Sequence, residues 1–198
     1  MTPVLILPLF SFLVLPIGWL EYRMLPKSRL AGILAFVNLI VLYCPWIIAI
    51  WHSHICYTCI IFRLLGLCMI ATALALWKTA APLILRVPGQ LRAMPEKIVT
   101  EGPFRHTRHP LYVGHVLFIS GGLLIFGALK IFMETPLVWG IAAIAALYEE
   151  NTRLKPHFGE TFQKYKSKTP FLLPLWGWIL LAFIYIGVIV QLFISVFQ

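Results

Sequence analysis

Residues 102–115 hold an unusual density of side chains that could do chemistry. The stretch reads GPFRHTRHPLYVGH and places two arginines and three histidines within eleven positions, directly before an apolar run, whereas only 12% of the whole chain is charged. Arginine pairs with carboxylates and phosphates, and histidine exchanges protons near neutral pH. The cluster therefore predicts either a binding site or an anchor at a polar boundary.

The composition places this cluster in a membrane protein. Of the 198 residues 61% are hydrophobic, and the mean hydropathy is +0.90, whereas a soluble domain carries about 25% charged residues. Runs of about 20 apolar residues suit helices that cross a bilayer, and continuous runs do not fit the alternating strands of a membrane barrel. We expect an all-α, polytopic bundle of about six transmembrane helices, at residues 3–20, 30–51, 60–79, 110–129, 132–148 and 173–197. The chain would form one membrane domain, residues 1–198, with three spans in 1–80, a region 95–175 that contains the cluster, and a final span in 173–197.

The positive charges alternate along the chain and predict an orientation. Fourteen of the 16 Lys and Arg residues fall in the segments 21–29, 78–108 and 153–168. Because cytoplasmic loops of membrane proteins are enriched in Lys and Arg, we expect both termini outside and the site at the cytoplasmic face. This distribution also accounts for the net charge of +9, so no nucleic-acid partner is expected. The first span lacks a basic leader and a cleavage site, which favours a retained helix over a signal peptide.

Two adjacent carboxylates, Glu149 and Glu150, are the predicted partners of the arginines and histidines. The spans 110–129 and 132–148 are joined closely and predict a tight hairpin. A helix that rises 1.5 Å per residue from Pro136 reaches Glu149 after roughly 20 Å, short of the ~30 Å hydrocarbon thickness. Carboxylates at that depth are costly, so a functional site is the first hypothesis.

The same count along the facing span brings the glutamates level with Tyr112 and His115. Together with Arg108 and His109, these side chains would form a pocket of mixed charge at the boundary between membrane and cytoplasm. The alternative is an interfacial ion pair between Arg108 and the glutamates, with no ligand. Two carboxylates, two histidines and a tyrosine exceed what such an anchor needs, which favours the pocket.

These motifs resemble the isoprenylcysteine carboxyl methyltransferase family. GPFRHTRHPLYVGH is followed, after two spans, by YEENTRLKPHFGETFQKYKSKTPFLLP, and together they are similar to the family's GPY-x-x-x-RHP-x-Y-x-G and EE-x-x-L-x-x-x-FG-x-x-Y-x-x-Y-x-x-x-x-P patterns over residues 95–175. The chain departs from them at Phe104, where tyrosine is usual, at Thr169, where an aliphatic residue often stands, and in its sixth span. Phospholipid N-methyltransferases have related patterns.

The resemblance implies a pocket for S-adenosylmethionine and a lipid-borne methyl acceptor that arrives from the bilayer. The catalytic residues carried over onto this sequence are Arg108, His109, Tyr112 and Glu150. The cofactor-binding residues carried over are Gly102, Pro103, Arg108, His109, Pro110, Tyr112, His115, Glu149 and Glu150. The chemistry agrees, because a glutamate suits the sulfonium and ammonium groups of the cofactor, while Arg108 and the N–H groups at the start of the fourth helix suit its carboxylate. A G-x-G-x-x-G turn is absent from the sequence, which excludes a soluble Rossmann-type methyltransferase.

The methyl acceptor is less defined than the cofactor. A carboxylate, as in an isoprenylcysteine, is already nucleophilic, so proximity and desolvation suffice and O-methylation of such an acceptor is the favoured interpretation. An amine, as in a phospholipid, needs a base such as His109, His115 or a glutamate. An NADPH-dependent sterol or enone reductase is another alternative, although the paired glutamates favour a cationic cofactor. A membrane transporter or assembly subunit is the non-enzymatic alternative.

The segment WHSHICYTC, residues 51–59, contains a further set of potential ligands. His52, His54, Cys56 and Cys59 have a spacing that could hold zinc, and the two cysteines could instead form a disulfide. An ordinary external loop is the favoured interpretation, so no metal is expected. Membrane lipids are the remaining expected partners.

Overall fold

A computed structural model describes residues 7–24, 29–52, 60–84 and 97–195, and every regular element in these ranges is helical. The N-terminal elements are η2 (Leu7–Leu13), α1 (Val14–Met24), α2 (Arg29–His52) and α3 (Ile60–Ile84). They are followed by η3 (Gly102–Arg105), α4 (Pro110–Ile125), α5 (Leu129–Phe132) and α6 (Thr135–Glu149). The C-terminal elements are a π-helical turn η4 (Glu150–Leu154), α7 (Lys155–Lys168) and α8 (Leu175–Ile194). The all-α prediction is confirmed for the described residues.

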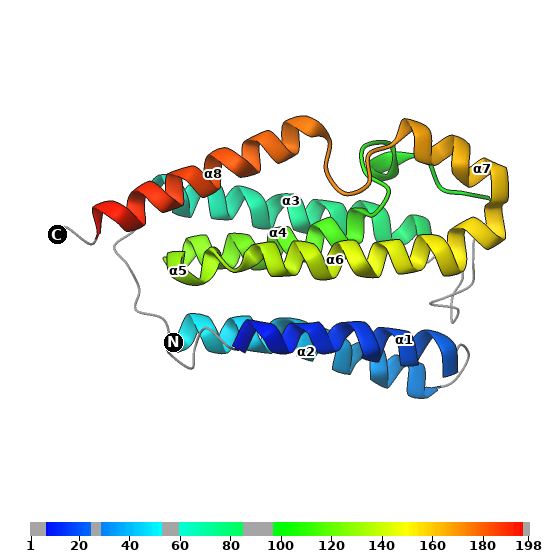
Figure 1. Ribbon diagram of the computed structural model, residues 1–198, viewed down its shortest axis with the longest axis horizontal. Helices are drawn as coiled ribbons and strands as arrows, with labels where there is room; N and C mark the ends of the chain where they lie inside the picture. The colour runs from blue at the N-terminus through cyan, green and yellow to red at the C-terminus, as the bar shows by residue number, and fades with distance from the viewer. Residues whose placement is uncertain (1–6, 25–28, 53–59, 85–96, 196–198) are drawn as a thin grey trace.

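The long helices run side by side along the long axis of the molecule (Figure 1). Helices α1 and α2 form one layer, α4 and α6 lie in the middle, and α3 and α8 lie on the other side. The start of the η2–α1 segment and the end of α8 lie toward one end of the molecule, whereas α7 is at the opposite end. The polar segment is therefore gathered at the end of the molecule that faces away from both described ends of the chain.

Four helical segments are long and apolar enough to cross a membrane, which fits an integral membrane protein. They are Ile33–His52, Ile60–Ile84, Leu129–Lys168 and Leu175–Ile194. The other two predicted spans appear as shorter apolar helices, Leu9–Leu20 and Pro110–Ile125. Helix α4 has 16 residues, or about 24 Å at 1.5 Å per residue, less than the ~30 Å of a hydrocarbon core. Six full spans therefore stay a prediction.

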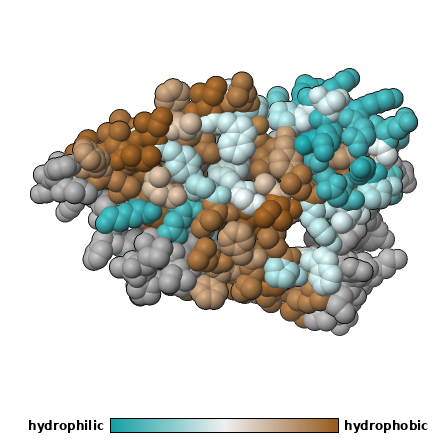
Figure 2. Space-filling model, viewed as in Figure 1, coloured by the Kyte–Doolittle hydropathy of each residue, from teal (hydrophilic) through white to brown (hydrophobic). Residues whose placement is uncertain are grey.

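The outer surface matches this membrane assignment. Large apolar side chains are exposed along the long helices, including Phe36, Ile47, Trp176 and Phe183. Figure 2 shows hydrophobic residues over most of the visible face, with hydrophilic side chains concentrated at the end formed by α7. A bilayer can cover the first region while water covers the second.

Helices α3 and α4 approach each other closely through two glycines. A Cβ atom added to Gly66 would lie 2.6 Å from the carbonyl oxygen of Gly121, and one added to Gly121 would lie 2.7 Å from that of Gly66. Small residues permit such packing in membranes, where helices gain little from burying apolar surface against one another. This contact fixes α4, which begins at the RHP sequence, against the long helix α3.

The chain reverses direction after α6 through two local departures from the α-helix. The turn η4 is π-helical, with the N–H of Lys155 bonded to the carbonyl of Glu150. Gly159 then has φ +51°, a left-handed conformation that glycine adopts without the steric cost of a Cβ. As a result the second half of α7 folds back over residues 102–109 (Figure 1), and the following segment leads into α8.

Candidate active site

The loop before α4 is held by α7 and by the segment that follows it. The hydroxyl of Tyr165 donates to the carbonyl of Phe104 at 2.7 Å, and the N–H of Arg108 donates to the carbonyl of Pro170 at 3.0 Å. The hydroxyl of Thr107 donates to the carbonyl of Phe171 at 3.4 Å. Two segments about 60 residues apart in sequence are thus joined, and Arg108 and His109 are fixed at the start of α4.

Glu150 is the centre of a buried charge cluster. Its side chain is 2% exposed and its carboxylate lies 3.1 Å from Nε of Arg108, 3.0 Å from Nε2 of His109 and 3.2 Å from Nζ of Lys166. Arg108 and His109 are also buried, whereas Lys166 is 44% exposed on α7. A carboxylate in apolar surroundings is stable only when it is paired in this way, so Glu150 is ionised and joins α4, η4 and α7.

Arg108 is positioned by several different contacts. Its Nη1 donates to the carbonyl of Lys166 at 3.5 Å, and its guanidinium lies 5.2 Å from the centre of the Phe171 ring. The Nε–H is not directed at Glu150, so this contact is an ion pair without a hydrogen bond. Burial lowers the pKa of the Arg108 guanidinium, while the negative charge of Glu150 acts in the opposite direction. The ordinary pKa of arginine is so high that the group stays a cation.

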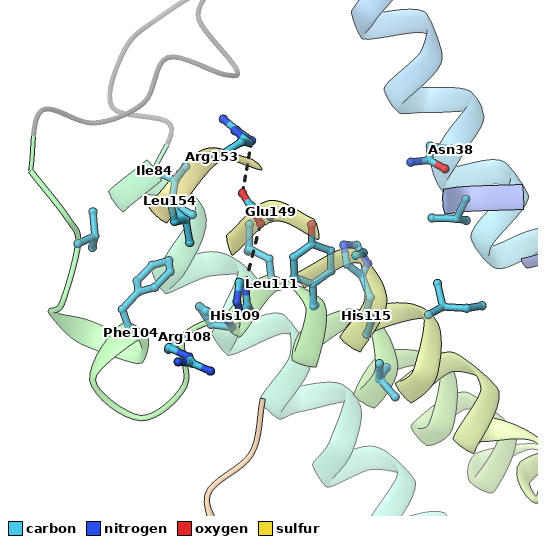
Figure 3. Close-up of a pocket in the computed structure, with 18 of the residues that line it drawn as sticks. Asn38, Ile84, Phe104, Arg108, His109, Leu111, His115, Glu149, Arg153 and Leu154 are labelled. Atoms are coloured by element: carbon cyan, nitrogen blue, oxygen red, sulfur yellow. Dashed lines mark hydrogen bonds and ion pairs between the residues drawn. The ribbon is translucent and has the colours of Figure 1, made fainter. Parts of the chain in front are cut away.

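Glu149 has a different environment from its neighbour. Its side chain is 28% exposed, and its carboxylate accepts a hydrogen bond from Nη1 of Arg153 at 3.3 Å and lies 3.9 Å from Nδ1 of His109. Figure 3 shows it between these two partners, among the residues that line a pocket. The imidazole of His109 therefore lies between two carboxylates, one buried and one able to meet a ligand.

A cavity of about 540 Å³ extends from this polar cluster into the apolar part of the molecule. This volume lies within the range of about 300–1,000 Å³ that is typical of small-molecule sites. One wall is α1 and α2 and the opposite wall is α4 and α6, with apolar residues such as Leu39, Leu42, Val116, Ile141, Ala142 and Ala145. Along α6 the cavity runs from Glu149 to Val138, eleven residues or about 16 Å. The shape combines a charged end with a long apolar end.

Most of the predicted site residues meet at this cavity. It is lined by Arg108, His109, Pro110, Tyr112, His115 and Glu149. Glu150 is buried behind its charged end. Gly102 and Pro103 lie elsewhere, in a separate surface hollow with Leu76, Thr79, Arg105, His106 and Thr107.

Two predicted residues are held by aromatic neighbours. The ring of Tyr112 packs against His109 with 5.6 Å between centroids. His115 forms a hydrogen bond with the hydroxyl of Tyr43 on α2 and packs against Trp77 of α3, 5.0 Å away. The ring of His115 is thus fixed by three helices at the side of the cavity.

Several residues of the cavity were not predicted from the sequence. Arg153 lies one turn after Glu149, a spacing that could have indicated the ion pair. Asn38 lines the cavity from α2, where no motif drew attention to it. The candidate ligands of the 51–59 loop lie outside the described residues except for His52, and within the described residues no three His, Cys, Asp or Glu side chains are arranged to hold a metal.

The charged end has the chemistry that S-adenosylmethionine requires. The partly exposed carboxylate of Glu149 can meet a cationic group, and the guanidinium of Arg153 beside it can meet a carboxylate. Arg108 also lines this end, although its charge is balanced by Glu150. The side chains that surround the cavity therefore fit a ligand that carries both signs of charge and an apolar reaction partner.

A comparison with family profiles gives a match to Phospholipid methyltransferase over residues 59–161, just over half of the chain. The chain belongs to the phospholipid methyltransferase family. Membership means a membrane methyltransferase that acts on lipid-like substrates, and S-adenosylmethionine is the methyl donor typical of the family. The region of the family match includes the first motif, the paired glutamates and Arg153, and it ends at residue 161 within the second motif. Helices α1, α2 and α8 lie outside it. No curated protein and no solved structure matches the chain.

Proposed function

We propose that this phospholipid methyltransferase family member transfers a methyl group from S-adenosylmethionine to the carboxylate of an isoprenylcysteine-like lipid. The observation that supports this acceptor is that the bases at the charged end of the cavity are already engaged. His109 is held by two carboxylates, His115 by Tyr43, and Glu149 by Arg153. A carboxylate needs no base, so it suits a site of this kind.

The donor would be held at the charged end. In this proposal Glu149 binds the ammonium group and Arg153 and the N–H groups at the start of α4 bind the carboxylate. Glu150 and Arg108 keep His109 and the RHP turn in place, and Tyr112 and His115 form the side of the site that the sulfonium faces. Gly102 and Pro103 would act at a distance, by shaping the loop that carries Arg108.

The acceptor would enter from the bilayer along the apolar part of the cavity. S-adenosylmethionine supplies an electrophilic methyl group, which a carboxylate oxygen takes up as the carbon–sulfur bond breaks, and no proton moves. The side chains of α2, α4 and α6 exclude water along the lipid chain, and desolvation makes the carboxylate more reactive. In agreement with the positive charge of the α7 end, we place the charged end of the site at the cytoplasmic face.

Methylation of a phospholipid amine is a second candidate, favoured by the match to the phospholipid methyltransferase family. The amine would need to lose its proton, and a base would have to leave its present partner for that purpose. Such an acceptor would also place its phosphate near the arginines at the charged end.

The experiment is methyl transfer by the detergent-solubilised protein with S-adenosylmethionine labelled in its methyl group. N-acetyl-S-farnesylcysteine and phosphatidylethanolamine are offered in separate reactions. We expect label in the first, released as methanol by mild base because the product is a methyl ester. Base-stable label in the phosphatidylethanolamine reaction, with none in the other, would replace the proposal by the amine candidate.

A further inference from the structure

Asn38 is a polar residue in a helix that is otherwise apolar. It lies on α2, within the membrane-spanning segment Ile33–His52. Between Ile33 and Trp51 it is the only acid, base, carboxamide, serine or threonine. It is the fifth residue after Ile33, so it is about 7.5 Å inside the apolar segment. Polar side chains at such depth are costly and usually have a partner or a function.

No partner is present for this carboxamide among the described residues. Its Oδ1 is buried without a hydrogen bond. A role as a polar link between α1 and α2 would require a bond across their interface, as polar residues form between membrane helices. Its Nδ2 does approach α1, 3.4 Å from the position that a Cβ would take on Gly18, but glycine offers no side chain to bond. Helix packing therefore does not explain the residue.

Asn38 lines the same cavity as the candidate active site. It is on the α2 wall, and Figure 3 shows it across the pocket from His109, Glu149 and His115. The residues around it on this wall, including Leu39 and Leu42, are apolar. Because Oδ1 is itself buried, Nδ2 is the part of the carboxamide that the α2 wall can offer to whatever occupies the cavity. Helix α2 is outside residues 59–161 that match the family.

We infer that Asn38 determines acceptor specificity by hydrogen bonding to an amide group of the lipid acceptor. The N–H₂ group of the Asn38 carboxamide can donate a hydrogen bond, and the C=O group of an amide can accept it. The amide nitrogen of an N-acylated prenylcysteine is attached to the carbon that bears the carboxylate, so it accompanies the reacting group into the site. A phospholipid such as phosphatidylethanolamine has no amide. This inference rests on the proposed function and specifies how its acceptor is selected.

The inference is tested by binding of two matched compounds in detergent micelles. N-acetyl-S-farnesylcysteine has the amide, whereas S-farnesyl-3-mercaptopropionic acid keeps the farnesyl chain and the carboxylate but lacks it. A net hydrogen bond of about 1 kcal/mol predicts a preference of the wild-type protein for the first compound of about fivefold. The variant Asn38→Leu should lose this preference, because leucine has a similar size and no hydrogen-bonding group.

Two controls separate recognition from general damage. Leu39→Val changes an apolar residue of the same wall and should alter the affinity for both compounds equally, leaving their ratio unchanged. Asn38→Leu should bind S-adenosylhomocysteine as the wild-type protein does, which shows that the fold and the charged end are intact. Asn38→Ser, which keeps a donor and an acceptor, should restore part of the preference.

An unchanged ratio in Asn38→Leu overturns the inference, as does the absence of a preference or of binding in the wild-type protein. The proposed function is judged separately by methyl ester formation. If the preference depends on Asn38 but no methyl ester forms, the inference about Asn38 is supported and the proposed O-methyltransferase function is rejected. If the methyl ester forms but Asn38→Leu has the same ratio of affinities for the two compounds as the wild-type protein, the proposed function is supported and the inference about Asn38 is rejected.

Discussion

Replacing Glu149 and Glu150 one at a time by glutamine should separate ligand binding from stability. The two residues are adjacent, and each substitution removes one negative charge with almost no change of volume. Glu150 is buried at the junction of α4, η4 and α7, whereas Glu149 is partly exposed at the cavity. The same chemical change is therefore expected to have two different effects.

The loss of stability in Glu150→Gln follows from its partners. Removal of one member of a buried ion pair costs about 3–5 kcal/mol, because the other charge remains buried. Arg108 is such a charge, since its side chain is 7% exposed. The contact with Lys166 adds little, because pairs with exposed lysines contribute about 0–1 kcal/mol. At ~2–4 °C per kcal/mol for a chain of this size, the unfolding midpoint should fall by on the order of 10 °C.

Glu149→Gln should affect the ligand instead. Its ion pair with Arg153 is partly exposed and separated by one helical turn, so its loss costs about 0.5 kcal/mol of stability. A charge-assisted hydrogen bond to the ligand is worth about 1.5–3 kcal/mol, so the affinity for S-adenosylhomocysteine should fall by about 10- to 100-fold.

Thermal unfolding measures the stability of each variant, and isothermal titration calorimetry in the same detergent measures its affinity for S-adenosylhomocysteine. The titration is done at a temperature below the unfolding midpoint of the less stable variant. An unfolding midpoint for Glu150→Gln within about 2 °C of the wild-type value would show that the buried cluster does not stabilise the fold. An undiminished affinity in Glu149→Gln would show that this carboxylate does not meet the ligand.

Two further predictions concern helix packing and the acceptor. Gly66→Ala should destabilise the protein by about 1–3 kcal/mol, because the added Cβ would lie 2.6 Å from the backbone oxygen of Gly121. Gly122→Ala is the matched control on α4, because no atom lies within 4 Å of the Cβ that it adds. Equal unfolding midpoints for the two variants would contradict this account of the α3–α4 contact. Above pH 5.5 a carboxylate acceptor, with an ordinary pKa of about 3.5, is fully ionised, so kcat/KM should not rise with pH through acceptor ionisation. A tenfold rise per pH unit between pH 6 and 8 would instead indicate that an amine must lose its proton.

The meeting of the two motifs could be predicted from the sequence. Proline and the apolar runs define the hairpin of α4 and α6, and constant helical rise brings Glu149 to the same end as the RHP sequence. Both glutamates contact His109, and Glu150 also contacts Arg108, about one turn before the predicted level of Tyr112 and His115. The count along the facing span began at residue 129, the end of the predicted span. In the structure α4 already ends at Ile125, about one turn earlier, and the short helix α5 follows it.

The distinction between the two glutamates could not be predicted. Adjacent residues on a helix point about 100° apart, and the sequence contains no signal for which of them faces inward. That choice depends on α7 folding back at Gly159 and bringing Lys166 against Glu150. The role of Asn38 was also inaccessible, since a single polar residue in an apolar run becomes informative only when its neighbours are known.

The π-helical turn at Glu150–Leu154 makes chain length in this segment matter more than residue type. A π turn holds one residue more than an α turn and keeps the following helix in phase, whereas deletion of a single residue between Lys155 and Gly159, where the winding is α-helical, would rotate everything beyond it by about 100°. The bend at Gly159 would then direct α7 away from the loop that carries Arg108. In relatives, the spacing between the paired glutamates and this glycine is thus a more informative mark of a working site than the amino acids that fill it.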